Sequence, residues 1–148
     1  MGVYSLYPNK ENLIIDVGTC ITYDYINQNN EYLGGSISPG FQLRSNALSI
    51  YTANLPNLDI QLKKQPLIGG NTKSSIQSGI INGVMAEITQ IIEDYKKLSP
   101  EINVILTGGD TAFIKSMVTI KKNSIFALEN LTLIGLNAIH KFLSLIHI

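Results

Sequence analysis

The residue types best suited to chemistry lie in one stretch, residues 13–22, where an apolar run ends in an acid, a glycine and a hydroxyl. Asp16 is followed closely by Gly18 and Thr19. A strand that ends in such a turn can present backbone N–H groups and a hydroxyl to phosphate oxygens. Because a carboxylate repels phosphate, Asp16 would need a cation between the two groups. Taken alone, the same residues also fit an ordinary β-turn.

Three further segments could approach a ligand, and each also has a purely structural explanation. Residues 107–110 (Thr-Gly-Gly-Asp) end an apolar run and open a predicted helix, an arrangement that is common at nucleotide sites. Glycines at residues 34–35 allow a backbone to approach a ligand, or they form a bulge. Asn71 and Thr72 begin a predicted helix, where helix capping is the simpler explanation.

The remaining reactive side chains are isolated. Cys20 is the single cysteine, so it cannot form an internal disulfide or supply a zinc site. We expect Cys20 to be a buried packing residue and His140 to be a surface or packing residue.

The composition limits the classes of function. Eleven Lys and Arg residues balance eleven Asp and Glu residues, and Arg44 is the one arginine, which argues against a nucleic-acid groove. No apolar run reaches the ~18 residues that span a bilayer, and the first residues do not resemble a signal peptide. We therefore expect a cytoplasmic protein that does not bind membranes. Only 15% of residues are charged, so some apolar surface is expected to be buried in a subunit or domain interface.

The apolar pattern predicts one α/β domain over residues 1–142. In the helix predicted at residues 76–95, apolar side chains recur every three or four positions. Gly79 and Gly83 lie on the neighbouring face, where each costs about 1 kcal/mol relative to alanine. Close approach of another backbone would offset that cost. Strands are predicted at residues 13–16, 20–26, 32–38, 103–107 and 124–127, helices at 41–51, 76–95, 111–117 and 131–142, and a long loop at 55–70.

The resulting order, β-β-β-α-α-β-α-β-α, indicates a mixed sheet covered by helices. This order is similar to one half of the actin-like (ribonuclease H-like) fold, in which two such halves close over a nucleotide.

Taken together and in order, the motifs resemble the C-terminal half of a type III pantothenate kinase. The resemblance covers the chain from Tyr4 to Phe142. It rests on Asp16-Val-Gly-Thr-Cys-Ile-Thr22, Gly34-Gly-Ser-Ile-Ser-Pro-Gly40, Arg44 with Ala47-Leu48, Thr52-Ala-Asn-Leu-Pro56, Gly70-Asn-Thr72, Ser75-Ile-Gln-Ser-Gly79, Thr107-Gly-Gly109 and Leu131 to Leu136.

The resemblance implies ATP-dependent phosphorylation of pantothenate to 4'-phosphopantothenate, the first step of coenzyme A biosynthesis. It also implies a homodimer that requires potassium or ammonium, with magnesium accompanying ATP. By position, Asp16 would hold the monovalent cation, Thr19 would contact ATP phosphate, and Gly18 would allow that approach. The Gly108-Gly109 pair would lie along the nucleotide, and Thr72 would contact pantothenate across the dimer interface. We further infer that the glycine face of the helix at 76–95 is a dimer contact.

Two elements expected of this family are not found in the 148 residues. They are an Asp-x-Gly-Asn-Thr phosphate loop and a Gly-x-Asp-Arg segment, whose Asp is the expected general base. Asp24, Asp59 and Asp110 lie in the wrong sequence contexts to replace it. We therefore expect the N-terminal half to be absent, no catalytic base in this chain, and no turnover by the chain alone.

Residues 143–148 resemble the translation of a sequencing adapter and are expected not to be native. Two alternatives remain open at this stage. One is a non-catalytic accessory protein of the same fold that binds nucleotide and has a regulatory role. The other is an actin-like assembly module that forms filaments.

Overall fold

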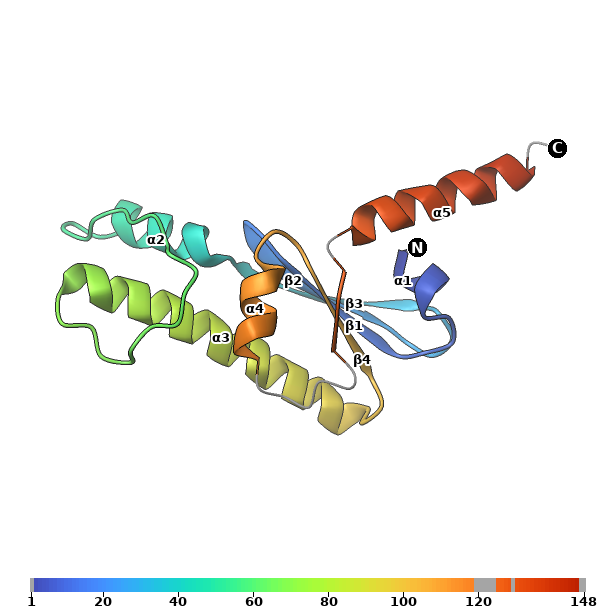
Figure 1. Ribbon diagram of the computed structural model, residues 1–148, viewed down its shortest axis with the longest axis horizontal. Coiled ribbons are helices and arrows are strands. Elements are labelled where there is room, and N and C mark those ends of the chain that lie inside the picture. Colours follow the sequence, from blue (N-terminus) through green and yellow to red (C-terminus); the bar gives the residue numbers. More distant parts are fainter. Residues whose placement is uncertain (1, 119–124, 129, 147–148) are drawn as a thin grey trace.

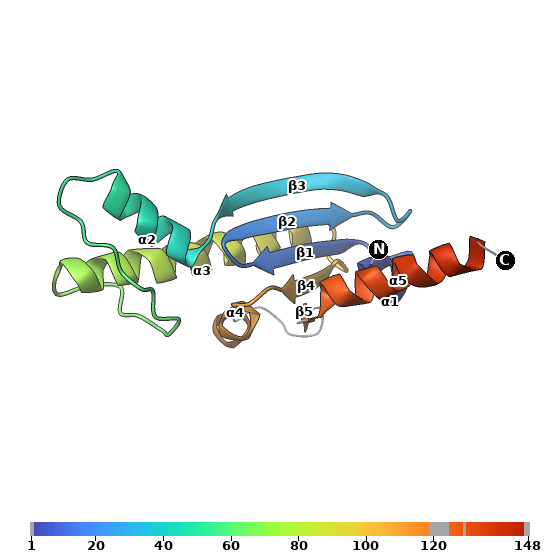
Figure 2. The same cartoon turned by 90° about the horizontal axis from the view of Figure 1, so that it is seen from above.

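A five-stranded mixed sheet forms the centre of the molecule, in the order β3-β2-β1-β4-β5 (Figures 1 and 2). The computed structural model describes residues 2–118, 125–128 and 130–146. β1 pairs antiparallel with β2 and parallel with β4; β2 pairs antiparallel with β3, and β4 pairs parallel with β5. The strands are β1 (Asn12–Val17), β2 (Cys20–Ile26), β3 (Tyr32–Pro39), β4 (Asn103–Thr107) and β5 (Ile125–Ala127).

The described residues form five helices: α1 (Gly2–Leu6), α2 (Phe41–Ile50), α3 (Thr72–Leu98), α4 (Thr111–Met117) and α5 (Leu131–Ile146). The long helix α3 runs behind the sheet in Figure 2, and its first turns extend with α2 beyond the sheet. α1 packs closely against α5: a Cβ at Gly2 would lie only 2.7 Å from the carbonyl oxygen of Leu131. α5 then projects away from the body of the domain (Figure 1).

The alternation of β1 determines which side chains are buried against α3 and which face the opposite side. Leu13, Ile15 and Val17 are buried in the core shared with α3. Ile14 packs instead with α1 on the other face. Asp16 follows the same alternation and lies on the face opposite α3, where it is exposed.

The predicted α/β fold and its mixed sheet are confirmed, with differences in the helices. α3 extends beyond its predicted bounds of 76–95 at both ends, from Thr72 to Leu98. α1 was not predicted, and α5 continues to Ile146, past the predicted end at residue 142. Ser124, the predicted first residue of the last strand, lies outside the described residues.

The segment at 55–70 contains no helix or strand, as predicted, and hydrogen bonds fix it to the two neighbouring helices. The hydroxyl of Ser45 donates to the carbonyl oxygen of Leu58 (2.7 Å), and that of Ser78 donates to the carbonyl oxygen of Pro66 (2.6 Å). Asn71 caps α3 by accepting from the backbone N–H of Ser74. Thr72 is therefore the first helical residue and not the cap.

Candidate functional site

Two turns that are distant in the sequence meet at one edge of the sheet. The β1–β2 turn contains Gly18 and Thr19, and the β4–α4 turn contains Gly108-Gly109. Because β1 and β4 are parallel, with Asp16 in register with Thr107, their carboxyl ends reach the same edge. The backbone N–H of Asp110 donates to the carbonyl oxygen of Val17 (3.2 Å) and links the two turns.

Gly108 lies directly against the Asp16 carboxylate. Its φ is +96°, a conformation that side-chain-bearing residues rarely adopt. A Cβ at this position would lie 2.4 Å from the carbonyl oxygen of Val17 and 2.5 Å from Oδ1 of Asp16. Only glycine allows the β4–α4 turn to approach the carboxylate and the backbone of Val17 this closely.

A cavity of about 400 Å³ opens at this junction, and Asp16 and Gly109 are among its lining residues. Two of its hydroxyls are already engaged: Thr107 donates to the carbonyl oxygen of Leu128 (2.7 Å), and Thr111 donates to that of Gly108 (2.8 Å). The lining residues are Asp16, Thr107, Gly108, Gly109, Thr111, Ala112 and Thr132.

The carboxylate of Asp16 could bind one cation, provided that a ligand supplies further oxygen atoms to coordinate the same cation. Its side chain is exposed, and neither ion pair found among the described residues involves it. The described part of the chain contains no group of three or more His, Cys, Asp or Glu residues that could hold a metal. A single carboxylate provides charge but no cage, so phosphate and backbone oxygens would have to complete the coordination of a cation here.

The segment that joins β3 to α2 packs against the backbone of the Gly18–Thr19 turn. The backbone N–H of Gly40 donates to the carbonyl oxygen of Thr19 (2.9 Å). A Cβ at Gly40 would lie 2.1 Å from the carbonyl oxygen of Gly18, so the two backbones are in direct contact. Thr19 itself is exposed, and its hydroxyl has no hydrogen-bond partner within the described ranges.

The positions of Gly35 and Cys20 are explained by the packing of strands and do not require a ligand. A Cβ at Gly35 would lie 1.8 Å from the carbonyl oxygen of Tyr23, so this glycine allows β3 to pack on β2. Cys20 is exposed, and the prediction that it is buried was wrong. The cause is the alternation of β2, which buries Ile21 and turns Cys20 to the opposite face.

Thr72 does not share the cavity of Asp16. It lines a separate, mainly apolar groove of about 930 Å³ between α2 and α3, together with Arg44 and Gly79. A Cβ at Gly79 or at Gly83 would find no atom within 4 Å. The glycine face of α3 is therefore uncovered by the described part of this chain.

Asp110, at the start of α4, is an acid at this edge whose pKa is shifted by the fold. Burial raises the pKa of its carboxyl, and no side-chain hydrogen bond at the start of α4 offsets this effect. The carboxylate of Asp24 accepts hydrogen bonds from the hydroxyls of Thr22 (3.0 Å) and Tyr32 (2.9 Å).

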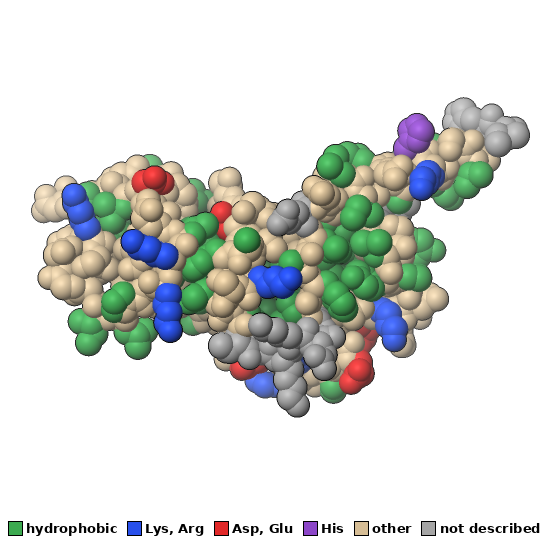
Figure 3. Space-filling view, in the orientation of Figure 1, with side chains coloured by type: hydrophobic (Ala, Val, Ile, Leu, Met, Phe, Trp, Pro, Cys, Tyr) green, Lys and Arg blue, Asp and Glu red, His purple; other side chains and the backbone are tan. Residues whose placement is uncertain are grey.

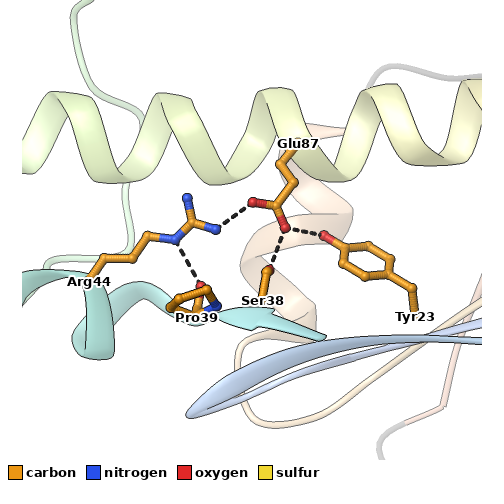
Figure 4. Close-up of polar contacts among 5 residues, drawn as sticks. All are labelled: Tyr23, Ser38, Pro39, Arg44 and Glu87. Carbon is orange, nitrogen blue, oxygen red and sulfur yellow. Dashed lines mark hydrogen bonds and ion pairs between the residues drawn. The ribbon is translucent and has the colours of Figure 1, made fainter. Parts of the chain in front are cut away.

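A polar cluster around Glu87 of α3 was not predicted (Figure 4). Its carboxylate accepts hydrogen bonds from the hydroxyls of Tyr23 (2.8 Å) and Ser38 and forms an ion pair with Arg44. Burial acts to raise the pKa of Glu87, but the hydrogen bonds from Ser38, Arg44 and Tyr23 outweigh it and lower the pKa below its ordinary value. Burial and the adjacent carboxylate raise the pKa of Tyr23. The cluster joins α3 to β2, β3 and α2.

Apolar side chains are exposed around α5, where hydrophobic side chains gather on the surface (Figure 3). Leu133, Leu136 and Phe142 have 62%, 57% and 58% of their surface exposed. Within the described ranges, no helix is long and apolar enough to cross a membrane. Exposed apolar surface of this extent is typical of a contact site.

A family model and individual relatives of this chain identify the same family. The family of type III pantothenate kinases matches residues 1–94. A type III pantothenate kinase of Flavobacterium psychrophilum is 43% identical over 141 residues, which are 95% of this chain and 57% of the relative. That of Christiangramia forsetii is 47% identical over 137 residues, which are 92% of this chain and 54% of the relative. The chain thus spans about half the length of the curated relatives it matches.

A solved structure supports the fold. A conserved protein of Campylobacter jejuni, described as a Baf family transcriptional activator, is 24% identical, with a TM-score of 0.62. The match covers 95% of this chain and 60% of that chain, and it shows a shared fold. With the family match over most of the chain, the protein belongs to the type III pantothenate kinase family.

Proposed function

We propose that this chain forms one lobe of an enzyme that transfers a phosphoryl group from ATP to the primary hydroxyl of pantothenate, in the first step of coenzyme A biosynthesis. The observation that carries the proposal is the meeting of the β1–β2 and β4–α4 turns beside the Asp16 carboxylate. Phosphoryl transfer depends mainly on positioning and on neutralisation of charge. Membership of the kinase family supports the choice of substrate.

We assign the phosphates of ATP to the two turns. Thr19 offers an exposed hydroxyl with no partner in the described part of the chain. Gly18 leaves space beside it, since a Cβ there would meet only the carbonyl oxygen of Cys20, at 4.0 Å. Gly109 adds open space on the β4–α4 side, since a Cβ there would meet no atom within 4 Å. These residues bind and orient the nucleotide through short polar groups that approach it closely.

We assign potassium or ammonium to Asp16, with magnesium bound to the phosphates of ATP. A cation at this carboxylate would offset the repulsion between Asp16 and phosphate, and the exposed carboxylate leaves space for it. The absence of a larger acidic cluster in the described ranges fits one monovalent ion better than a protein cage for a divalent ion.

We propose that a homodimer places Thr72 beside pantothenate. Thr72 lies in the α2–α3 groove, away from the Asp16 cavity of its own chain, so a second copy is the simplest route to a shared site. The open faces of Gly79 and Gly83 allow a helix of that copy to approach closely. We also propose that the exposed apolar surface of α5 is covered by the second lobe of the cytoplasmic enzyme, which supplies the general base.

A fused enzyme tests the proposal. The part of the Flavobacterium psychrophilum relative that lies outside its match to this chain is joined to the 148 residues. We expect phosphopantothenate formation that requires ATP and either potassium or ammonium. Asp16→Asn should lower kcat/KM by about 10²-fold or more, whereas Asp59→Asn, at an exposed acid of the 55–70 loop, should leave it unchanged.

Equal activity of the Asp16→Asn and Asp59→Asn enzymes would contradict the assignment of Asp16. A fused protein that binds ATP with potassium yet forms no phosphopantothenate would instead favour the accessory function. The curated relatives reported above are named as kinases, which does not favour that alternative.

A further inference from the structure

The carboxylate of Glu87 lies outside the nucleotide cavity but is connected to it through the backbone. Glu87 binds Ser38 at the end of β3 and Arg44 in the first turns of α2 (Figure 4). Between these two residues the chain passes through Pro39 and Gly40. Glu87 therefore holds this connecting segment on both sides.

Arg44 extends the connection to the turn that carries Thr19. Its Nε donates to the carbonyl oxygen of Pro39 (2.8 Å), and its backbone N–H donates to the carbonyl oxygen of Gly40 (3.1 Å). Gly40 in turn donates its N–H to the carbonyl oxygen of Thr19 (2.9 Å). A continuous set of hydrogen bonds thus runs from α3 to the β1–β2 turn.

We propose that Glu87 is a positioning residue for the Gly18–Thr19 turn. It holds Ser38 and Arg44 in place, and these residues fix the Pro39–Gly40 segment against the carbonyl oxygens of Gly18 and Thr19. The consequence for ATP binding rests on the proposed function, whereas the mechanical link does not. Since Thr72 begins α3, the same helix connects the α2–α3 groove to the turn.

A carboxylate is well suited to this position. Ionised, it accepts only, and here it receives hydrogen bonds from two hydroxyls and a guanidinium. Replacing it with an amide leaves the guanidinium of Arg44 without a counter-charge, although its side chain is only 25% exposed. Arg44 then loses the partner that keeps its Nε directed at Pro39.

Amide hydrogen exchange of the 148-residue chain tests the link, because it needs no substrate. In Glu87→Gln, we expect the protection of the Gly40 N–H to fall about tenfold or more, since hydrogen bonds to charged groups are among the stronger ones. The protection of Leu106, in the centre of the sheet, reports global stability and should fall much less. The matched control is Asp94→Asn, which removes an exposed acid of α3 paired with Lys97 and should change neither amide.

A second variant keeps the proposal testable if Glu87→Gln does not fold. Arg44→Lys retains a charge opposite Glu87, but one ammonium cannot also replace the Nε contact with Pro39. We expect the same selective loss of Gly40 protection. Unchanged Gly40 protection, or a loss that Leu106 shares equally, in either variant would overturn the positioning role. Neither result bears on phosphopantothenate formation by the fused enzyme, so the two proposals fail separately.

Discussion

Gly108→Ala is the substitution that most directly probes how the two turns meet. The added Cβ would lie 2.4 Å from the carbonyl oxygen and 2.7 Å from the backbone nitrogen of Val17. It would also lie 2.5 Å from Oδ1 of Asp16, which can rotate away, whereas the backbone of a central strand cannot. We therefore expect the variant to separate the turns and displace the carboxylate.

The magnitude follows from two terms. A side chain at the positive φ of Gly108 costs about 1–2 kcal/mol. Steric overlap with the backbone of Val17 adds about 1–3 kcal/mol, as for other overpacked positions. The expected loss in the free energy of unfolding is thus about 2–5 kcal/mol, a large part of the roughly 5–15 kcal/mol typical of a domain.

Urea unfolding followed by circular dichroism measures this loss, with two glycines as controls. Gly34 has a φ of +103° but open space around it, so Gly34→Ala should cost only the backbone term of about 1–2 kcal/mol. Gly109 has open space and no positive φ, so Gly109→Ala should change stability by no more than about 0.5 kcal/mol. If Gly108→Ala costs no more than Gly34→Ala, the proposed contact between the turns is refuted.

Three further predictions concern the helix face, the cysteine and the pH dependence. Gly79→Ala and Gly83→Ala should each stabilise the isolated chain by about 0.5–1 kcal/mol and weaken its self-association in analytical ultracentrifugation; unchanged association would argue against a dimer contact on this face. Cys20 should react with a thiol reagent in the native chain almost as fast as in urea, and strong protection would contradict its exposure. Hydrogen bonds from Ser99 and Tyr25 lower the pKa of Glu11 below its ordinary 4.5 in the folded chain. The stability that Glu11 contributes is therefore present above about pH 4.5 and lost as the pH falls through the folded pKa. Glu11→Gln should reduce this loss in urea unfolding at acidic pH, and an unaltered pH profile would exclude the contribution.

The sheet could be predicted because its strands are short apolar runs bounded by clear turn residues. The helix α3 could be predicted because its apolar period continues over many turns. α1 could not, since five residues at the start of the chain carry too little periodic signal, and its helical form depends on packing against α5. The burial of Cys20 was mispredicted because a residue next to a turn can face either side of a strand.

The candidate site was only partly predictable. Asp16, Gly18 and Thr19 form a local motif, so their turn could be predicted from neighbouring residues. The contact between Gly108 and Asp16 depends on strand pairing, which the sequence pattern alone does not specify. The Glu87 cluster was missed because its partners are 43, 49 and 64 residues away in the sequence and belong to three different elements.

The central claim is that the two turns form one half of an ATP site with a monovalent cation at Asp16. An NMR titration of the isotope-labelled chain with magnesium-ATP tests this claim most directly. We predict that shift changes concentrate at the amides of Gly18, Thr19, Gly108 and Gly109 in potassium chloride. They should weaken when choline replaces potassium or when Asp16 is changed to Asn. Shift changes that leave these four amides unaffected, or that are insensitive to both potassium and Asp16→Asn, would contradict the account.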